Sequence, residues 1–319
     1  MRRGKRRRIR VLTWHVHGNY LWYLSQVPHD FLLPVKPGRP HPYGGRAGTF
    51  PWPDNVHEVD AADVCRARFD CVLYQTQENF TVDQFELLTP AQRRLPRVYL
   101  EHDPPLAHPF AQRHAVDDPD VPVVHVTAWN AMMWDCGRSP VRVIEHGVLI
   151  PDDVRYTGEL RRGICAINNL RTRARRMGAD ILTTACASVP IDLVGMDATS
   201  LGGIGEIDPP ALAAFQARYR FAFSPVRHTS LALAVVEAMM VGLPIVGLAT
   251  CELASVVRSG ESGFVDSSLP RVLDAAQALL ADPAEAKRLG NGARKIAAER
   301  FGIERFVSDW DAVLREVAA

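Results

Sequence analysis

Short, continuously apolar runs alternate with longer helical stretches along this chain. Runs that are apolar throughout are typical of parallel strands that helices cover on both faces. The pattern therefore predicts an α/β fold with parallel sheets. In the first half of the chain, strands are predicted at Ile9–Trp14, Cys71–Tyr74, Val98–Leu100, Val121–Val126 and Val141–Ile144.

The stretch from Pro28 to Asp60 interrupts this rhythm. Its many prolines and glycines favour turns over regular elements. We therefore expect one long loop there, of the kind that is usually functional or disordered.

The α/β rhythm restarts after a polar, turn-like segment at Pro151–Glu159. We place a domain boundary there, which gives a Rossmann-like domain over 1–150 and a second over 151–319, flanking a cleft. Strands of the second half are predicted at Ile164–Ile167, Ile191–Val194, Phe221–Phe223 and Ile245–Leu248. Helices are predicted at Ala174–Ala187, Leu231–Val241, Pro270–Leu280, Pro283–Glu299 and Ile303–Val317.

The charge balance argues against a polyanionic partner. Thirty-seven basic residues oppose 36 acidic ones, a net charge of +1, so no global field attracts nucleic acid or an anionic membrane. The basic start, Met1–Arg10, is the local exception. We expect it to be a solvated, frayed tail, with contact to acidic lipid or RNA as the alternative. His15 and His17 interrupt the short apolar stretch that follows, so we expect no signal peptide.

The spacing of the cysteines and the length of the apolar runs indicate in which cellular compartment the protein is expected. The six cysteines form no Cys-x-x-Cys pair, which argues against a zinc ribbon or a disulfide scaffold. No apolar run approaches the roughly 20 residues that span a bilayer. We expect a cytoplasmic protein with peripheral membrane contact at most and no nucleic-acid partner.

The segment Ser224–Gly247 carries the clearest chemical signal. A buried strand ends near Pro225, a polar loop follows, and a helix is expected from about Ser230. The N–H groups at such a helix start hold phosphate. Glu237 lies among apolar residues, so its carboxylate requires a partner such as a ribose diol. The alternative is a glutamate on the exposed face of the helix.

This segment resembles a known family. The loop after Pro225, the helix with Glu237-Ala-Met, Gly242-Leu-Pro-Ile-Val246 and Ser259-Gly-Glu-Ser-Gly-Phe-Val265 look like the donor half of family 4 retaining glycosyltransferases of GT-B fold. Val141–Val148 and Gly178–Leu182 resemble further motifs of that family. The resemblance implies two glutamates separated by seven residues. Glu237 matches the second, which holds the ribose, and Thr229 occupies the first position.

A group of arginines follows the first strand of the second half. The resemblance implies an arginine at the position of Asn169 and a lysine at that of Met177, and the chain instead places arginines between them. Arginine forks suit a diphosphate, and a metal-free site requires fixed positive charge for the leaving group. The alternative is a solvated basic helix start. The donor-binding candidates are Asn169, Arg171, Arg173, Arg176, Arg227, Thr229, Ser230, Leu231 and Glu237.

The ends of strands in the first half of the chain provide the catalytic and acceptor-binding candidates. His102 and Asp103 follow a strand at its carboxyl edge, where open α/β sheets bind ligands. They resemble the family's His-Asp, in which the histidine faces the transferred sugar, and are the catalytic candidates. A turn after the first strand supplies acceptor-side candidates: Gly18, Asn19 and Tyr20. His15 and His17 share a strand face, which leaves a metal site as an alternative, although we expect none.

The resemblance implies metal-independent transfer of a sugar from a nucleoside-diphosphate sugar to a hydroxyl of a glycan, lipid-linked or small-molecule acceptor, with retention and no further cofactor. The alternatives are a non-catalytic GT-B protein that binds a sugar nucleotide or glycan, and a sugar-nucleotide epimerase. Phe306 and Trp310, spaced i, i+4 on the last helix, pack either on the first domain, as in a crossover helix, or on their own domain.

Overall fold

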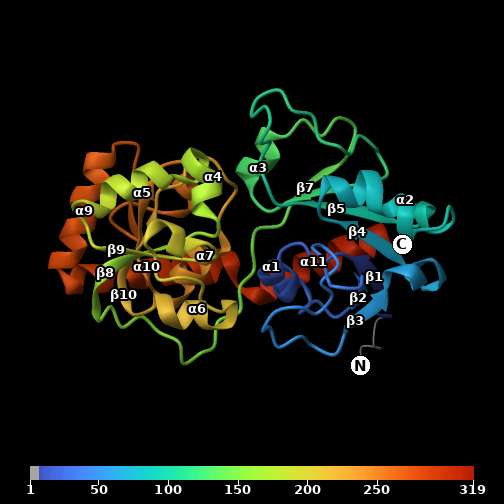
Figure 1. Cartoon of the computed structure of the whole chain (residues 1–319), viewed down its shortest axis with the longest axis horizontal. Helices are drawn as coiled ribbons and strands as arrows, with labels where there is room; N and C mark the ends of the chain where they lie inside the picture. The colour runs from blue at the N-terminus through green and yellow to red at the C-terminus, as the bar shows by residue number, and fades with distance from the viewer. Residues whose placement is uncertain (1–6) are drawn as a thin grey trace, which may run out of the picture. The chain divides into compact units, whose positions relative to one another are not determined.

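The structure, a computed structural model, describes residues 7–319 (Figure 1). The chain forms two compact units, the first built from Met1–Gly147 and Ile303–Ala319 and the second from Val148–Gly302. Much of the basic tail, including Arg2 and Arg3, lies outside the described residues. At the described end of that tail, Arg7 pairs with Asp70 at 2.7 Å and Arg8 with Asp30 at 3.0 Å.

The first unit is built on a seven-stranded sheet in which every pairing is parallel. The order β3-β2-β1-β4-β5-β6-β7 reverses direction between β1 and β4, and ligands of doubly wound sheets bind at such a switch point. The strands are β1 (Arg10–Thr13), β2 (Asp30–Val35), β3 (Val56–Asp60), β4 (Cys71–Tyr74), β5 (Arg97–Glu101), β6 (Val123–His125) and β7 (Val141–Val143).

Helices and single turns connect these strands. The α-helices are α1 (Gly18–Leu24), α2 (Gln84–Leu87), α3 (Ala128–Met133) and α11 (Ile303–Val317). The 3₁₀ turns are η1 (Ala61–Arg66) and η3 (Gln92–Arg94), and η2 (Asn79–Asp83) is a π turn.

The prediction of one long loop from Pro28 to Asp60 is wrong at both ends, because β2 and β3 lie there. Phe31 and Leu33 of β2 are fully buried, so packing against the core outweighs the turn preference of the prolines around them. The remaining loop, residues 36–55, is still long and rich in glycine and proline.

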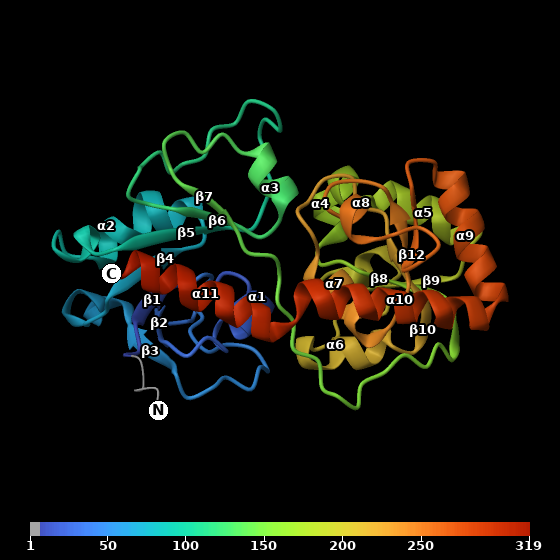
Figure 2. The ribbon, with the colours of Figure 1, turned by 180° about the vertical axis from the view of Figure 1, so that it is seen from behind.

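The last helix, α11, packs within the first unit, beside α1 (Figure 2). Phe306, Trp310 and Leu314 are fully buried there, and the Trp310 Nε1 atom donates a hydrogen bond to the Tyr20 hydroxyl at 3.1 Å. Burying each of these side chains contributes about 1.5–3 kcal/mol. The i, i+4 apolar pair therefore lies in the core of the unit that holds the N-terminus of the chain.

The second unit has a five-stranded parallel sheet of order β12-β11-β10-β8-β9, with helices on both faces (Figures 1 and 2). The strands are β8 (Leu160–Ala166), β9 (Ile191–Val194), β10 (Tyr219–Ser224), β11 (Ile245–Leu248) and β12 (Gly263–Asp266). The helices are α4 (Leu170–Met177), α5 (Ala179–Cys186), α6 (Pro209–Gln216), α7 (Leu233–Val241), α8 (Leu253–Val256), α9 (Leu269–Ala281) and α10 (Pro283–Phe301), with a 3₁₀ turn η4 (Ala198–Leu201).

The single helix predicted at Ala174–Ala187 is two helices, α4 and α5. Gly178 separates them in a left-handed conformation with φ of 82°. A Cβ atom at this position would collide with the carbonyl oxygen of Pro225, so the close approach of the two backbones requires glycine. Ala174 adds a second break inside α4, with φ of 44° and ψ of −131°.

Among the described residues, no helix is both long and apolar enough to cross a membrane.

Candidate active site

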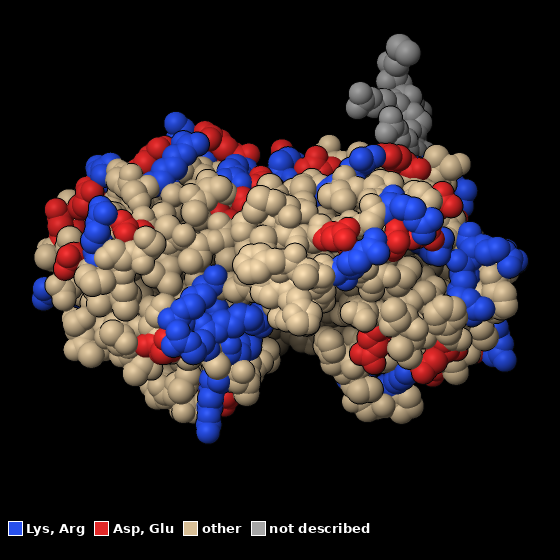
Figure 3. Space-filling model, turned by 90° about the horizontal axis from the view of Figure 1, so that it is seen from above, with Lys and Arg blue, Asp and Glu red and all other residues tan. Residues whose placement is uncertain are grey.

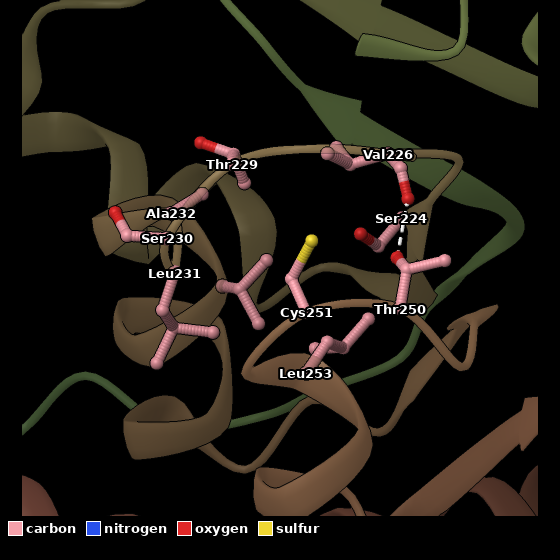
Figure 4. Close-up of a pocket in the computed structure, with 10 residues that line it drawn as sticks. Ser224, Val226, Thr229, Ser230, Leu231, Ala232, Thr250, Cys251 and Leu253 are labelled. Atoms are coloured by element: carbon pink, nitrogen blue, oxygen red, sulfur yellow. Dashed lines mark hydrogen bonds between the residues drawn. The ribbon is translucent and has the colours of Figure 1, made fainter. Parts of the chain in front are cut away.

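An open hollow lies in the second unit where β10 and β11 end and α7 begins (Figure 4). The Thr250 hydroxyl donates a hydrogen bond to the Val226 carbonyl at 2.6 Å, which ties the two loops of the rim together. The lining residues are Ser224, Val226, Thr229, Ser230, Leu231, Ala232, Val235, Thr250, Cys251 and Leu253. Thr229, Ser230 and Leu231 are predicted donor-binding residues, and the structure brings them together here.

Helix α7 starts at Leu233, slightly later than predicted, after Ala232 in an extended conformation. The first N–H groups of a helix have no partner within it, and they carry partial positive charge. Because the hollow lies at this helix start, it suits an anionic group such as phosphate.

Cys251 is a lining residue that sequence reasoning missed. Its sulfur points toward the loop that carries Thr229 (Figure 4). Burial raises the pKa of the Cys251 thiol, and a hydrogen bond from the Thr229 backbone N–H partly offsets this rise. Its position in the sequence could have indicated Cys251 as a site residue. It follows the apolar strand Ile245–Leu248, and ligands bind at the carboxyl ends of strands in open α/β sheets.

Glu237 lies inside α7 and is only 2% exposed. The alternative of an exposed surface glutamate is therefore wrong. Glu237 is not, however, among the residues that line the hollow.

The predicted arginines are concentrated on α4 and on the loop after β10. Figure 3 shows a patch of basic side chains on the second unit. Arg171 is exposed and makes no ion pair with any described residue, whereas Arg173 is half-buried. The Arg176 carbonyl accepts hydrogen bonds from the backbone N–H groups of Arg227 and His228, at 3.0 and 3.2 Å. Helix α4 is thereby fixed to the loop that leads into α7.

Arg227, a predicted donor-binding residue, pairs with a carboxylate in this structure. Its Nη1 and Nη2 atoms bind the two Asp180 carboxylate oxygens at 2.6 and 2.7 Å. The hydrogen bond from Arg227 lowers the pKa of Asp180 to about 2. Such bidentate pairs fix orientation, so Arg227 connects the loop after β10 to the start of α5. Sequence spacing could not reveal this pair, because Asp180 is remote in sequence.

Asn169, the N-cap residue of α4, has a left-handed conformation with φ of 52°. Its backbone N–H donates to the Met196 carbonyl at 2.7 Å. Asn169 therefore shapes the turn from which Arg171 and Arg173 project, and its side chain does not cap the helix.

The first unit has a second group of polar side chains at the carboxyl ends of β1, β4 and β5. The His102 ring lies with its centroid 4.4 Å from that of His17 and 4.8 Å from that of Tyr20. Its Nε2 atom is 3.0 Å from Oε1 of Gln75, a residue that the sequence analysis missed. Burial, and secondarily the nearby His17 and His146, hold the pKa of His102 well below its usual range. The His102 ring is therefore neutral near pH 7.

The backbone of Asp103 is held from both sides. Its N–H donates to the Glu101 Oε1 atom at 2.9 Å, and its carbonyl accepts from the Trp134 Nε1 atom at 2.8 Å and from the Asn130 side chain at 3.1 Å. The strand end that carries His102 is thereby fixed in place.

Glu101 and His114 form a buried pair that the sequence did not reveal. The His114 Nδ1 atom accepts a hydrogen bond from the Val116 N–H at 3.0 Å, so its Nε2 atom carries the proton that faces Glu101 Oε2 at 3.1 Å. Burial raises the pKa of Glu101. The other oxygen of Glu101, Oε1, accepts the Asp103 N–H, so the pair also holds the Asp103 backbone.

Of the acceptor-side candidates, Gly18 and Tyr20 have packing roles in this structure. A Cβ atom on Gly18 would lie 2.9 Å from the Phe50 ring and 3.1 Å from His15 Nε2. Tyr20 is 1% exposed, and its hydroxyl accepts the bond from Trp310. Asn19, on the same helix, is half-buried.

His15 and His17 have different neighbours in the structure. His15 Nδ1 is 2.6 Å from the Gly45 carbonyl oxygen, and its ring lies edge-on to Trp52, whereas His17 lies against His102. Within residues 7–319, no three His, Cys, Asp or Glu side chains are grouped as metal ligands.

Comparisons with solved structures identify the fold of the chain. The chain is similar to the solved sucrose-phosphate synthase of Thermosynechococcus elongatus, with a TM-score of 0.73 at 16% identity over 98% of this chain and 99% of that one. It is similar to HepE of Anabaena, solved with UDP and glucose, with a TM-score of 0.73 at 17% identity over 96% and 99%. A glycosyltransferase of Rickettsia africae gives 0.65 at 10% identity over 98% and 99%. No curated protein matches the sequence.

These likenesses show that the fold is GT-B. Residues 202–296, in the second unit, match the family model described as Glycosyl transferases group 1. The chain therefore has the GT-B fold, and part of its second unit matches glycosyl transferases group 1, so the resemblance noted in the sequence is confirmed at that level.

Proposed function

We propose that the protein is a metal-independent, retaining glycosyltransferase of family 4, which transfers a sugar from a nucleoside-diphosphate sugar to an acceptor hydroxyl. The observation that carries the proposal is the hollow at the start of α7. The loop that leads into α7 is hydrogen-bonded to helix α4, which carries the predicted arginines. Helix N–H groups and arginine side chains are two complementary ways to bind a diphosphate without a metal ion. HepE was solved with UDP-glucose, which supports a UDP-sugar as the first donor to test.

In the proposed reaction, the bond between the anomeric carbon and the diphosphate oxygen breaks while the acceptor oxygen bonds to the same face of that carbon. The acceptor proton passes to the departing phosphate oxygen, so no protein nucleophile is required. Arg171 and Arg173, with the amides of Thr229–Leu231, stabilise the charge that develops on the diphosphate. His102 and Asp103 face the transferred sugar.

Glu237 is the proposed ligand of the ribose. Its side chain is enclosed and does not line the hollow in this structure. We also propose a cytoplasmic location, where the cysteines stay reduced; none of the six forms a disulfide among the described residues.

A thermal-shift screen against UDP, GDP, ADP and dTDP, with magnesium and with EDTA, tests the donor site. A ligand that binds only the native state at 100 times its Kd stabilises that state by about 2.7 kcal/mol. We expect one nucleotide to raise the Tm equally with magnesium and with EDTA, and Arg171→Gln with Arg173→Gln to remove the shift. Arg258→Gln, on the same unit and paired with Glu261, is the matched control and should keep it.

The absence of a shift with any nucleotide at millimolar concentration would contradict the donor site. A shift without transfer or hydrolysis of any corresponding sugar nucleotide would favour a non-catalytic binding protein. Thr229, at the position where the family has a glutamate, is the observation that supports this second candidate.

A further inference from the structure

The loop between β10 and α7 is held on one side by the loop that follows β11. The Thr250 hydroxyl donates to the Val226 carbonyl at 2.6 Å (Figure 4). The Cys251 thiol donates to the Arg227 carbonyl at 3.4 Å, and its sulfur accepts a hydrogen bond from the Thr229 backbone N–H. These bonds fix the backbone of the loop directly before the segment that lines the hollow.

On its other side, the same loop is bonded to the second half of α4. Arg227 Nη1 donates to the Arg175 carbonyl at 2.8 Å, and the backbone N–H groups of Arg227 and His228 donate to the Arg176 carbonyl. Ala174, with φ of 44° and ψ of −131°, breaks α4 directly before these two carbonyls. Alanine is strained in this conformation, so the surrounding contacts must hold the break in place.

Asp180, in the first turn of α5, joins two of these arginines. Its Oδ1 atom accepts from Arg227 Nη1 at 2.6 Å, and its Oδ2 atom accepts from Arg227 Nη2 at 2.7 Å and from Arg175 Nη1 at 2.8 Å. The pair of Asp180 and Arg227 is partly exposed, and pairs in such positions contribute little to stability. A bidentate pair does, however, fix the orientation of the groups that it joins.

A carboxylate in an arginine fork can affect an anionic ligand in two opposite ways. It can hold the loop in the shape that binds the ligand, or it can neutralise cations that the ligand would otherwise use. The remaining arginines of α4 favour the first role. Arg171 makes no ion pair with any described residue, and the Nη1 atom of Arg176 is buried without a hydrogen-bond partner among residues 7–319. Cations for a diphosphate are therefore present outside the Asp180 cluster.

We propose that Asp180 is a positioning residue, which clamps Arg227 and Arg175 so that the segment Thr229–Leu231 already has the shape that receives the diphosphate before the nucleotide binds. This inference rests on the proposed function and deepens it, because it assigns donor affinity to a residue that does not line the hollow. Asp180 acts through the loop rather than by contact with the ligand. A loop that is ordered in advance loses less conformational entropy on binding.

Hydrogen–deuterium exchange of the free protein tests the clamp without any ligand. Asp180→Asn should speed exchange of the amides at 226–231 roughly tenfold, because fewer bonds oppose local opening. Peptides of β10 should exchange as in the wild type, which excludes global unfolding. Asp192→Asn is the matched control, since Asp192 also pairs with an arginine, Arg162, and does not line the hollow. Unchanged exchange at 226–231 in Asp180→Asn would overturn the clamp.

Calorimetric titration with the nucleotide that the thermal-shift screen selects measures the consequence for binding. Asp180→Asn should weaken binding roughly tenfold, whereas Asp180→Glu, which keeps the carboxylate, should recover most of the affinity. Asp192→Asn should bind as the wild type does. Tighter binding by Asp180→Asn would show that the carboxylate competes with the ligand, and it would overturn the proposal.

A double-mutant cycle tests whether Asp180 acts through Arg227. Arg227→Lys keeps the charge and removes the fork, so the variant that combines it with Asp180→Asn should bind no more weakly than Asp180→Asn alone. Fully additive losses would overturn this role. Faster loop exchange without any loss of affinity would also overturn it. Absence of nucleotide binding in the wild type would instead overturn the proposed function, while the exchange result alone decides whether the clamp exists.

Discussion

Arginines predicted for the same site differ in their partners in this protein. Arg171 is exposed and makes no ion pair with any described residue, while the Arg227 fork is occupied by both oxygens of Asp180. The sequence ranks the two side chains alike, because both are arginines near the expected phosphate site. Only the fold shows which one has a carboxylate beside it. Residue type therefore predicts the chemistry of this site, and tertiary contacts assign that chemistry to individual side chains.

Glu237→Ala tests the proposed ribose ligand. We expect the variant to lose the nucleotide-induced rise in Tm, because the ribose diol loses its carboxylate acceptor. Hydrogen bonds to charged groups contribute about 1.5–3 kcal/mol, so affinity should fall roughly 10- to 100-fold. Calorimetric titration with the nucleotide measures this. Glu299→Ala, at an exposed position of α10, should bind as the wild type does. Undiminished binding in folded Glu237→Ala would contradict the assignment.

At the scale of elements, the sequence predicts well those segments whose own pattern decides the outcome. The strands Cys71–Tyr74, Ile191–Val194 and Ile245–Leu248 and the helix Ile303–Val317 have their predicted bounds. The failures share a physical cause. Strand β2 forms against local turn preference because the core buries Phe31, and α4 ends at Gly178 because the Pro225 backbone passes too close for a side chain.

The packing of α11 gives a prediction at this scale. Trp310→Ala leaves a cavity among Tyr20, Phe306 and their neighbours, which should lower the free energy of unfolding by about 3–5 kcal/mol. Trp310→Phe keeps most of the volume and loses the bond to the Tyr20 hydroxyl, so it should cost about 1–2 kcal/mol. Urea denaturation of both variants measures the difference. Equal losses would show that the hydrogen bond, rather than packing, holds the helix.

At the scale of the whole molecule, buried histidines link stability to pH. Burial lowers the pKa of several of them, and that of His125 falls to about 3. The unfolded chain binds protons on these rings below about pH 6.5, and the folded chain binds fewer at the same pH. The further histidines with lowered pKa are His15, His29 and His102.

The direction in which the free energy of unfolding changes with pH follows from the linkage between proton binding and folding. Since the unfolded state binds more protons, the free energy of unfolding falls as the pH drops below about 6.5, by up to about 1.4 kcal/mol per pH unit for each such histidine. Urea denaturation at pH 7.5 and pH 5.0 should show this loss. His125→Gln should lose less stability than the wild type over the same interval. Equal stability of the wild type at both pH values would contradict the burial of neutral histidines.

The sequence by itself determined the α/β class and the group 1 resemblance. These features depend on apolar periodicity and on short motifs, which are local properties of the chain. The tertiary structure alone decided that Gln75 faces His102, that Asp180 occupies Arg227 and that Tyr20 is enclosed by α11. Each of these contacts joins residues from different elements, and no local pattern encodes which side chains meet when strand ends and helices converge.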